Sequence, residues 1–273
     1  MQGLLDLDEP APFEVMGHDG TSPFVIVCDH AGRLLPKALG DLGVADAADR
    51  DRHIAWDIGA GAVARRLGAA LDAFVITQTY SRLVIDCNRP LEVSDSIVSA
   101  SDGTDVPGNV GIARPAAEAR ARAVFHPYHD QIRRELDRRR SLGRAACLIS
   151  VHSFTPVWRQ AARPWHAGVL YLHDRRMAAP LLRLLRAEPD LVIGENEPYR
   201  ADTLTDFTVV EHAERRGLPY VEVEIRQDLI ADEAGQVAWA TRLARLLPLA
   251  SHESSLESSS RTENEPSALA GSS

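Results

Sequence analysis

Two histidines stand where two apolar, strand-like runs of the sequence end. His30 follows the run Phe24–Asp29, and His152 follows the run Cys147–Val151. Continuous apolar runs of this length are typical of buried parallel strands. Because ligands of open α/β sheets sit beyond the carboxyl ends of the strands, we expect both imidazoles at one edge of a sheet. Two imidazoles delivered to one edge could share a single metal ion.

A third histidine, His53, stands near the start of a predicted helix over Arg50–Ala70. On such a helix His53 and Asp57 are four residues apart and share a face. This spacing suits a metal ligand supported by a neighbouring carboxylate. The alternative is a helix cap or a surface group, which is the more usual role of a histidine at a helix start.

The run Tyr220–Arg226 alternates between apolar and polar residues. Its valines and isoleucine face one side, and Glu222 and Glu224 face the other. One interpretation is an edge strand with a solvated face. The other places a glutamate beside the metal, where it takes a proton from zinc-bound water and hands it to a departing amine.

A second group of polar residues surrounds a short apolar core in Tyr80–Pro90. The planar fork of an arginine suits the recognition of a carboxylate, so this segment is a candidate substrate-binding element. A surface turn held by ion pairs is the alternative. The residues concerned are Arg82, Asp86, Asn88 and Arg89.

Strands and helices alternate along the body of the chain, which predicts an α/β fold: a three-layer α/β/α arrangement around a mostly parallel or mixed sheet. The predicted strands are Phe24–Asp29, Phe74–Thr79, Ala146–Val151, Val169–Leu172, Leu191–Gly194 and Tyr220–Arg226. The predicted helices are Arg50–Ala70, Pro115–Arg140, Met177–Arg186, Phe207–Arg216 and Gln236–Leu247. In the second of these, the proline between His126 and His129 favours a structural or supporting role for both.

The domain organisation follows from the ends of the chain and from its loops. We expect an irregular lead-in over residues 1–20, a single domain over 21–250 and a disordered Ser/Glu-rich tail over 251–273. Two long loops, Glu92–Ile112 and Phe154–His166, lack periodicity, and loops of this length are usually functional. We expect them to shape a pocket.

Composition excludes several classes of protein. A net charge of -9 argues against a nucleic-acid partner, and no apolar run is long enough to span a membrane. Without an apolar leader sequence, we expect a cytoplasmic protein. The three cysteines form no paired motif, which argues against a disulfide framework and an all-cysteine zinc site. The motifs G-x-S-x-G and H-E-x-x-H are absent.

Taken together, these segments resemble the N-formylglutamate amidohydrolase family over about residues 20–248. Five segments in this order carry the resemblance: Asp29–Gly32, Ser81–Pro90, Pro127–Asp130, Val151–Ser153 and Val223–Ile225. The family is similar to zinc carboxypeptidases and aspartoacylases, which also order a first histidine, an Asn-Arg pair, a His-Ser turn and a late glutamate. The resemblance implies a phosphorylase/hydrolase-like version of the predicted fold.

The resemblance also implies one zinc ion per chain, held by His30 and His152. In the carboxypeptidases a glutamate three residues after the first histidine completes the site, and here that position is Arg33. The third ligand is therefore open. We expect His53, with Asp57 as the alternative.

The same resemblance assigns roles to the remaining residues. Glu224 would be the general base and acid, Asn88 and Arg89 would bind the substrate carboxylate, and Arg82 would join them or polarise the carbonyl. The expected reaction is hydrolysis of the C–N amide bond of N-formylglutamate or a related N-formyl or N-acyl amino acid, by attack of metal-bound water. The expected partner is that small molecule, with no nucleic acid and no membrane. The exact substrate, the metal's identity, the pathway and the choice between monomer and homo-oligomer stay open.

Two other functions remain in view. One is a carboxypeptidase-like or cell-wall amide hydrolase. The other is a non-catalytic protein that binds an anionic metabolite through Arg82 and Arg89 without a metal.

Overall fold

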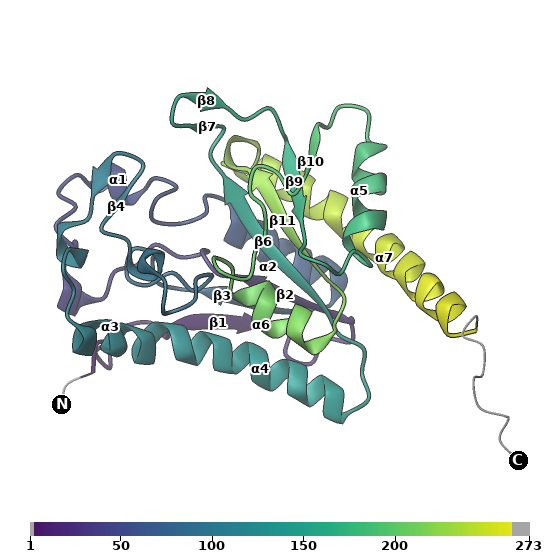
Figure 1. Cartoon of the computed structure of the whole chain (residues 1–273), viewed down its shortest axis with the longest axis horizontal. Helices are drawn as coiled ribbons and strands as arrows, with labels where there is room; N and C mark the ends of the chain where they lie inside the picture. The colour runs from purple at the N-terminus through teal and green to yellow at the C-terminus, as the bar shows by residue number, and fades with distance from the viewer. Residues whose placement is uncertain (1–2, 264–273) are drawn as a thin grey trace, which may run out of the picture.

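The computed structural model describes residues 3–263, and their side chains up to residue 254. A seven-stranded sheet lies at its centre, with helices on both faces (Figure 1). The strands, in spatial order, are β1 (Phe13–Met16), β3 (Phe74–Gln78), β2 (Phe24–Cys28), β6 (Cys147–Phe154), β11 (Tyr220–Arg226), β9 (Ala167–Leu170) and β10 (Ile193–Glu195).

The sheet is mixed, but its central part is parallel. Strands β3, β2, β6 and β11 run in the same direction, whereas β1 and β9 each pair antiparallel with their inner neighbours. Glu224 on β11 stands opposite His152 on β6 in this register. The carboxyl ends of β2, β6 and β11 therefore meet at one edge, as the apolar runs predicted.

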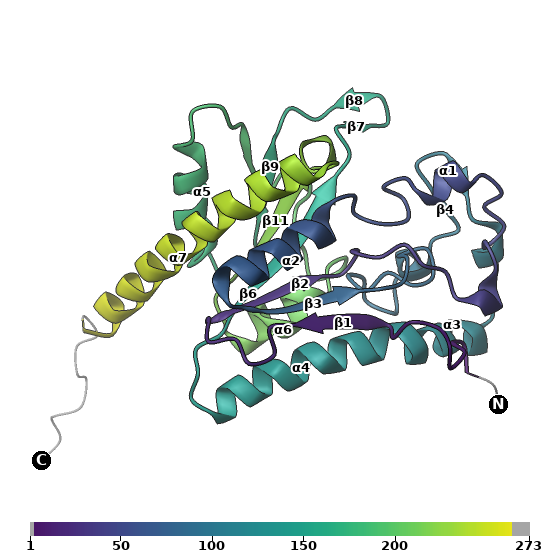
Figure 2. The same ribbon diagram turned by 180° about the vertical axis from the view of Figure 1, so that it is seen from behind.

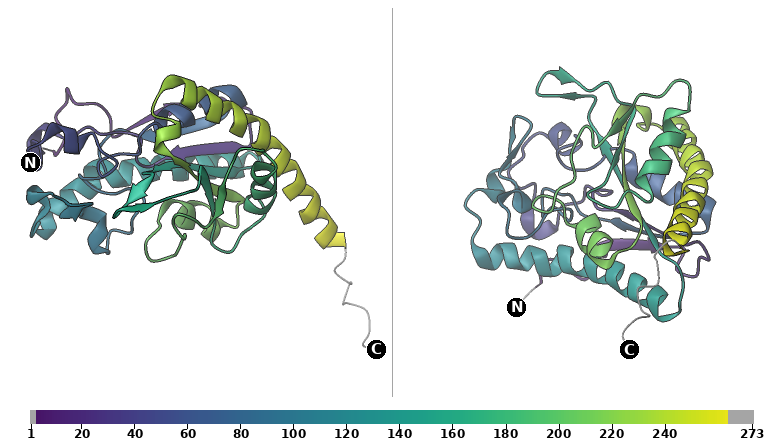
Figure 3. Two further views of the ribbon diagram at one scale, coloured as in Figure 1. Left: turned by 90° about the horizontal axis from the view of Figure 1, so that it is seen from above. Right: turned by 45° about the vertical axis from the view of Figure 1, so that its right-hand side comes forward.

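Helices cover the two faces of the sheet (Figures 2 and 3). On one face α2 (Ala60–Leu71) packs against α7 (Glu233–Glu263), and α5 (Ala178–Arg186) lies beside α7 near β9 and β10. On the other face α4 (His126–Ser141) packs against α6 (Thr208–His212). The predicted three-layer α/β/α fold is confirmed.

Strand β11 lies inside the sheet, between β6 and β9. All of its residues except Arg226 are buried, including Glu222 and Glu224. The interpretation of this run as an edge strand with a solvated face is therefore wrong. Two buried carboxyl groups on one strand need an explanation other than solvation, because a buried charge without a partner is costly.

The predicted helix over Arg50–Ala70 is interrupted. The chain forms a short α1 (Ala47–Arg50), then turns, and α2 begins only at Ala60. Gly59 adopts a φ of 80°, and a Cβ atom there would lie 2.1 Å from the carbonyl oxygen of Ile230. A φ of this sign lies outside the right-handed helical region, so no regular helix runs through Gly59. His53 and Asp57 therefore share no helix face.

The helix predicted over Pro115–Arg140 is confirmed as one continuous rod with a local adjustment. It comprises α3 (Arg114–Arg120), a π-helical turn over Ala121–Phe125, and α4. The wider turn comes immediately before Pro127, which has no N–H to donate within a regular helix. The helix therefore accommodates this proline without an interruption.

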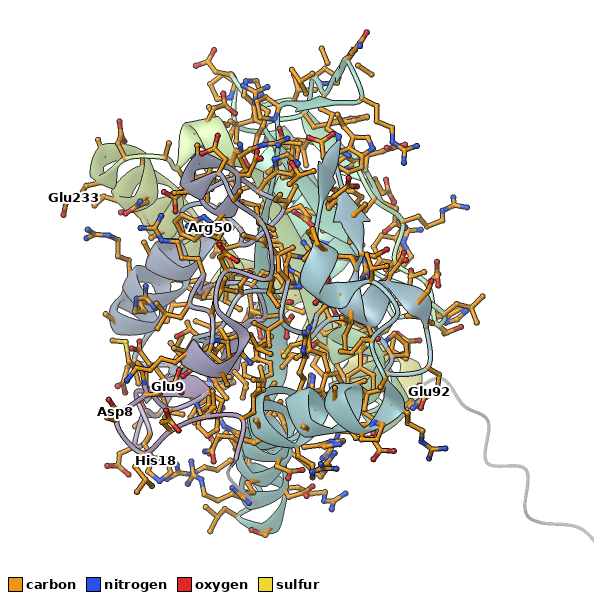
Figure 4. The ribbon with its side chains drawn as sticks, turned by 90° about the vertical axis from the view of Figure 1, so that its left-hand side faces the viewer. Asp8, Glu9, His18, Arg50, Glu92 and Glu233 are labelled. Atoms are coloured by element: carbon orange, nitrogen blue, oxygen red, sulfur yellow. The ribbon has the colours of Figure 1, made fainter. Side chains whose placement is uncertain are left out.

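The N-terminal lead-in is more ordered than expected. Phe13–Met16 forms β1 on the edge of the sheet, where its half-buried alternate residues pack beside β3. Upstream, a carboxylate oxygen of Glu9 accepts the backbone N–H of Lys37 at 2.8 Å, and Asp8 pairs with the side chain of Lys37. Figure 4 labels both carboxylates on this side of the molecule.

Residues 251–263, which belong to the segment expected to be a disordered tail, continue α7 in the structure. The helix is docked upstream by buried side chains such as Trp239, and by Glu253, which pairs with Arg183 of α5. Extending an existing helix costs far less free energy than nucleating a new one, so Ser/Glu-rich residues can continue α7 as a helix. Residues 264–273 lie outside the described part of the chain.

Cys28, Cys87 and Cys147 are free and buried. Within the described residues, no helix combines the length and apolarity needed to cross a membrane.

Candidate active site

A cavity of about 700 Å³ opens at the carboxyl ends of β2, β6 and β11. His30 after β2, residues 152–155 at the end of β6, and Glu222 and Glu224 of β11 line one side of it. The two long loops line another part of it, and each folds into a small hairpin: β4–β5 (Ala100–Ser101 and Thr104–Asp105) and β7–β8 (Val157–Trp158 and Ala161–Ala162). The expectation that these loops shape a pocket is confirmed.

Three buried side chains converge at the base of this cavity. His30, Asp57 and His152 each offer a ligand atom, and these atoms lie within 4.8 Å of one another. Oδ2 of Asp57 is 2.8 Å from Nδ1 of His152 and 3.4 Å from Nδ1 of His30. The Nδ1 atom of His30 is buried without a hydrogen-bond partner. Two imidazole nitrogens and one carboxylate oxygen are a donor set that zinc accepts.

The other nitrogen of each ring is held in place from behind. Nε2 of His30 lies 2.7 Å from Oδ1 of Asp86. Nε2 of His152 lies 3.0 Å from Oγ of Ser150 and 3.2 Å from Oδ2 of Asp29. A carboxylate behind each imidazole fixes the ring orientation and leaves Nδ1 for the group in front, which is the usual support of a metal-binding histidine.

The carboxylates also stabilise positive charge at this point. Burial alone would lower the pKa of His152, but its hydrogen bonds to Asp29 and Asp57 raise that pKa well above the ordinary value. Burial likewise opposes the ionisation of Asp57, yet the neighbouring His30 and His152 lower its pKa. The negative charge of these carboxylates, which stabilises a protonated imidazole, would equally stabilise a metal cation. Metal ions and protons compete for the same ring nitrogens.

His53, the expected third ligand, lies outside this group. Its Nε2 is 3.3 Å from Oδ2 of Asp102, and its ring packs edge-on against Trp158. It lines the cavity wall between the two hairpins. Asp57 joins the group instead because its backbone N–H donates to the carbonyl of His30 at 2.8 Å, which draws the turn to the end of β2.

Glu224 faces the cavity beside the group. It is 6% exposed, and its Oε2 atom has no hydrogen-bond partner. Burial raises its pKa to about 7. A carboxyl group with this pKa can both accept and release a proton near neutral pH.

Glu222 is a cavity residue to which the sequence assigned no role. It is buried, its Oε2 atom is also unpartnered, and burial raises its pKa to about 8. The alternation of β11 placed it on the same face as Glu224, so the pattern contained the signal that would have identified it.

The polar segment after β3 also reaches the cavity. Oδ1 of Asn88 accepts the backbone N–H groups of Phe207 and Thr208 at 3.2 and 3.0 Å, which leaves its amide nitrogen for the cavity. Nη1 of Arg89 donates to the carbonyls of Asn88 and Thr205. Asn88 and Arg89 thus lie side by side on the cavity wall.

Arg82 lies closer to the histidines. Its Nε and Nη2 atoms donate to Oδ2 of Asp86 at 3.0 and 2.6 Å, and its Nη1 is 3.7 Å from Oδ1 of Asp57. The alternative interpretation of this segment as a surface turn is wrong, because Asp86 and Asn88 are buried and Arg82 is largely so.

A loop that the sequence did not single out completes the cavity wall. Tyr199 lines the cavity, and its hydroxyl accepts a hydrogen bond from Arg163 at 2.9 Å. The guanidinium of Arg163 also lies over the rings of Tyr199 and Trp158, at 4.8 and 5.4 Å. This aromatic cluster joins the β7–β8 hairpin to the loop after β10, a contact between segments with no shared sequence signal.

Gly32 sets the path of the chain after His30. A Cβ atom at this position would lie 2.0 Å from the carbonyl oxygen of Thr79. We expect Gly32→Ala to lower the free energy of unfolding by about 2–3 kcal/mol, because backbone must move to relieve the overlap. Urea denaturation measures this, with Gly3→Ala as the control, since a Cβ there meets only an ordinary contact. Equal midpoints for the two variants would show that the turn is not tightly packed.

Comparison with known families agrees with this architecture. A family model described as N-formylglutamate amidohydrolase matches residues 22–231. The chain belongs to the N-formylglutamate amidohydrolase family, as the ordered motifs indicated.

Individual relatives extend this assignment. An N-formylglutamate deformylase of Pseudomonas putida is 36% identical over 153 residues, which cover 50% of this chain and 53% of that protein. The match thus spans about half the length of the curated relative. The crystal structure of a gene product of Agrobacterium tumefaciens is 35% identical, with a TM-score of 0.88, covering 93% of this chain and 99% of that one. An N-formylglutamate amidohydrolase of Ralstonia eutropha JMP134 is 17% identical, with a TM-score of 0.62 and coverage of 89% and 98%, and shares the fold.

Proposed function

We propose that this protein is a cytoplasmic, zinc-dependent amidohydrolase of amino-acid metabolism. It would cleave the C–N amide bond of N-formylglutamate or a related N-formyl or N-acyl amino acid. The observation that carries the proposal is the convergence of His30, Asp57 and His152 beside Glu224 in one cavity, in a chain of this family. The name of the Pseudomonas putida relative supports the choice of substrate.

We assign the metal to His30, Asp57 and His152, and not to His53. The carboxylate oxygen of Asp57 faces both imidazoles, whereas His53 is paired with Asp102. When bound, zinc polarises the carbonyl oxygen of the substrate and lowers the pKa of a water molecule to about 7.

Glu224 moves the protons of the reaction. Its unpartnered Oε2 accepts a proton from the attacking water as the water oxygen bonds to the carbonyl carbon. It then donates that proton to the nitrogen as the C–N bond breaks. The products of deformylation are formate and the free amino acid.

Asn88, Arg89 and Arg82 orient the substrate. The free amide nitrogen of Asn88 and the guanidinium of Arg89 provide donors for a carboxylate. Arg82 is fixed on Asp86 beside Asp57, so its position favours polarising the substrate carbonyl over joining the carboxylate pair. Fixed donors at developing negative charge are a large source of rate enhancement.

Metal analysis combined with a substrate panel tests the proposal. We expect about one zinc per chain, turnover of N-formylglutamate above N-acetylglutamate and short peptides, and loss of at least about 100-fold in rate after chelation, restored by zinc. Faster cleavage of peptides or cell-wall amides would assign a different hydrolase activity. Protein that purifies without metal and binds anions without hydrolysing them would favour the non-catalytic alternative.

A further inference from the structure

A pair of buried histidines lies behind the cavity wall. His129 of α4 and His212 of α6 are 1% and 0% exposed, and neither lines the cavity. Nδ1 of His129 lies 3.0 Å from Nε2 of His212, and the planes of the two rings are 19° apart. The rings of Phe125 and Phe207 pack against His129.

The carbonyl of Cys87 fixes the protonation of the pair. Nε2 of His129 lies 2.8 Å from this oxygen, which only accepts, so Nε2 carries a proton. In a neutral ring Nδ1 of His129 is then the acceptor, and Nε2 of His212 donates to it. Burial lowers the pKa of His129 to about 4 and lowers that of His212 well below its ordinary value. Both rings are thus neutral near pH 7, as this arrangement requires.

Helix α6 also contacts Asn88, the residue that follows Cys87. The N–H groups of Phe207 and Thr208, at its start, donate to the Asn88 side chain. The hydroxyl of Thr208 donates to Asp29 at 2.7 Å, and Asp29 contacts His152. The Cys87–Asn88 segment is therefore attached to α6 at two points. The histidine pair contacts the main-chain carbonyl of Cys87, and the start of α6 contacts the side chain of Asn88.

We propose that His129 and His212 are positioning residues for substrate binding. By fixing the Cys87 carbonyl, the pair sets the direction in which Asn88 and Arg89 face the cavity. The inference rests on the proposed function for the identity of the ligand. Packing alone does not account for the pair, because two polar rings buried among phenylalanines are costly unless hydrogen bonds offset their burial, and three of the four ring nitrogens make such bonds.

The test compares variants that keep or remove the hydrogen bond to Cys87. In His129→Gln the side-chain amide nitrogen takes the place of Nε2 as the donor to Cys87, and His129→Leu removes that hydrogen bond. His212→Leu leaves the hydrogen bond to Cys87 in place but removes the contact of His129 with α6. His126→Leu is the matched control, since His126 is exposed on the same helix. The measurements are kcat and KM for N-formylglutamate, zinc content, and the Kd for L-glutamate by calorimetry.

We expect His129→Leu to raise KM and the Kd for L-glutamate about tenfold, with kcat within about threefold and zinc content unchanged. His212→Leu keeps the hydrogen bond to Cys87, so it should raise both values by a smaller factor of about three. His129→Gln should keep KM and Kd within about threefold of the original protein, and His126→Leu should change neither. If the leucine variants fail to fold, His129→Asn replaces them. Its shorter amide does not reach the Cys87 carbonyl, so the same rise is expected as for His129→Leu.

Unchanged KM and Kd in variants that lose this hydrogen bond would overturn the inference, as would a loss of zinc with KM preserved. If the original protein binds L-glutamate but does not hydrolyse N-formylglutamate, the proposed function fails and the Kd series still decides the role of the pair. A protein that neither binds L-glutamate nor hydrolyses N-formylglutamate overturns both.

Discussion

Glu224→Gln is expected to lower kcat for hydrolysis of N-formylglutamate by about 10²–10⁴-fold while zinc stays bound. Glutamine keeps the size of the side chain but cannot accept a proton from the attacking water. Because Oε2 of Glu224 has no hydrogen-bond partner in the protein, the substitution breaks no contact that holds the fold. Steady-state kinetics and zinc analysis on the same preparation measure both quantities.

Glu222→Gln is the matched control for this prediction. Glu222 lies on the same face of β11, lines the same cavity, and is also buried with an unpartnered Oε2. We expect a fall in kcat of less than about tenfold. Near-normal turnover in Glu224→Gln, or an equal loss in both variants, would remove Glu224 from the role of general base.

Asp57→Asn is expected to weaken zinc binding by at least about 100-fold and to lower activity in parallel. The substitution removes the charge of the only carboxylate in the buried group formed with His30 and His152 among the described residues. Even carboxylates that support metal ligands from behind contribute about 10–100-fold to affinity, so a direct ligand should contribute more. Competition with a chromophoric chelator gives the zinc Kd.

His53→Asn is the control that separates the two assignments of the third ligand. His53 lines the same cavity but contacts Asp102 and Trp158. We expect its zinc Kd to stay within about threefold of the original protein. Loss of zinc in His53→Asn with zinc retained in Asp57→Asn would return the site to the ligand set that the sequence suggested. Circular dichroism of each variant checks that the fold is intact, because Asp57 also accepts the N–H of Ser153.

The parts of the site that the sequence predicted are those that strand patterns encode. A continuous apolar run signals a buried parallel strand, so the positions of His30 and His152 at one sheet edge could be inferred. Alternation placed Glu224 on the opposite face from the core valines of β11, and the structure turns that face toward the cavity.

The third member of the buried group could not be inferred in the same way. Ile54 and Ile58 match helical periodicity, so the local pattern favoured a helix through His53 and Asp57. The helix is interrupted at Gly59, which has a positive φ and packs closely against the carbonyl of Ile230, far away in the sequence. A contact of this kind leaves no local signal. The same holds for the α6 contacts to Asn88, which join residues more than a hundred positions apart.

The ends of the domain show a related limit. Phe13–Met16 is too short to be recognised as a strand alone, and it forms because β3 offers an open edge. Residues 251–263 lack the apolar pattern of a packed helix, and they are helical because α7 is already formed before them.

The main-chain hydrogen bond between Asp57 and His30 has a consequence for the evolution of this family. It links His30 and Asp57 of the buried group through backbone atoms, independently of the side chains of residues 31–56, which lie between them in the sequence. The stretch that carries His53 can therefore diverge, and with it the shape of the entrance, without disturbing the group at the base. Relatives with different substrate preferences are expected to differ in this stretch and in the two hairpins, and to share the centre beneath them.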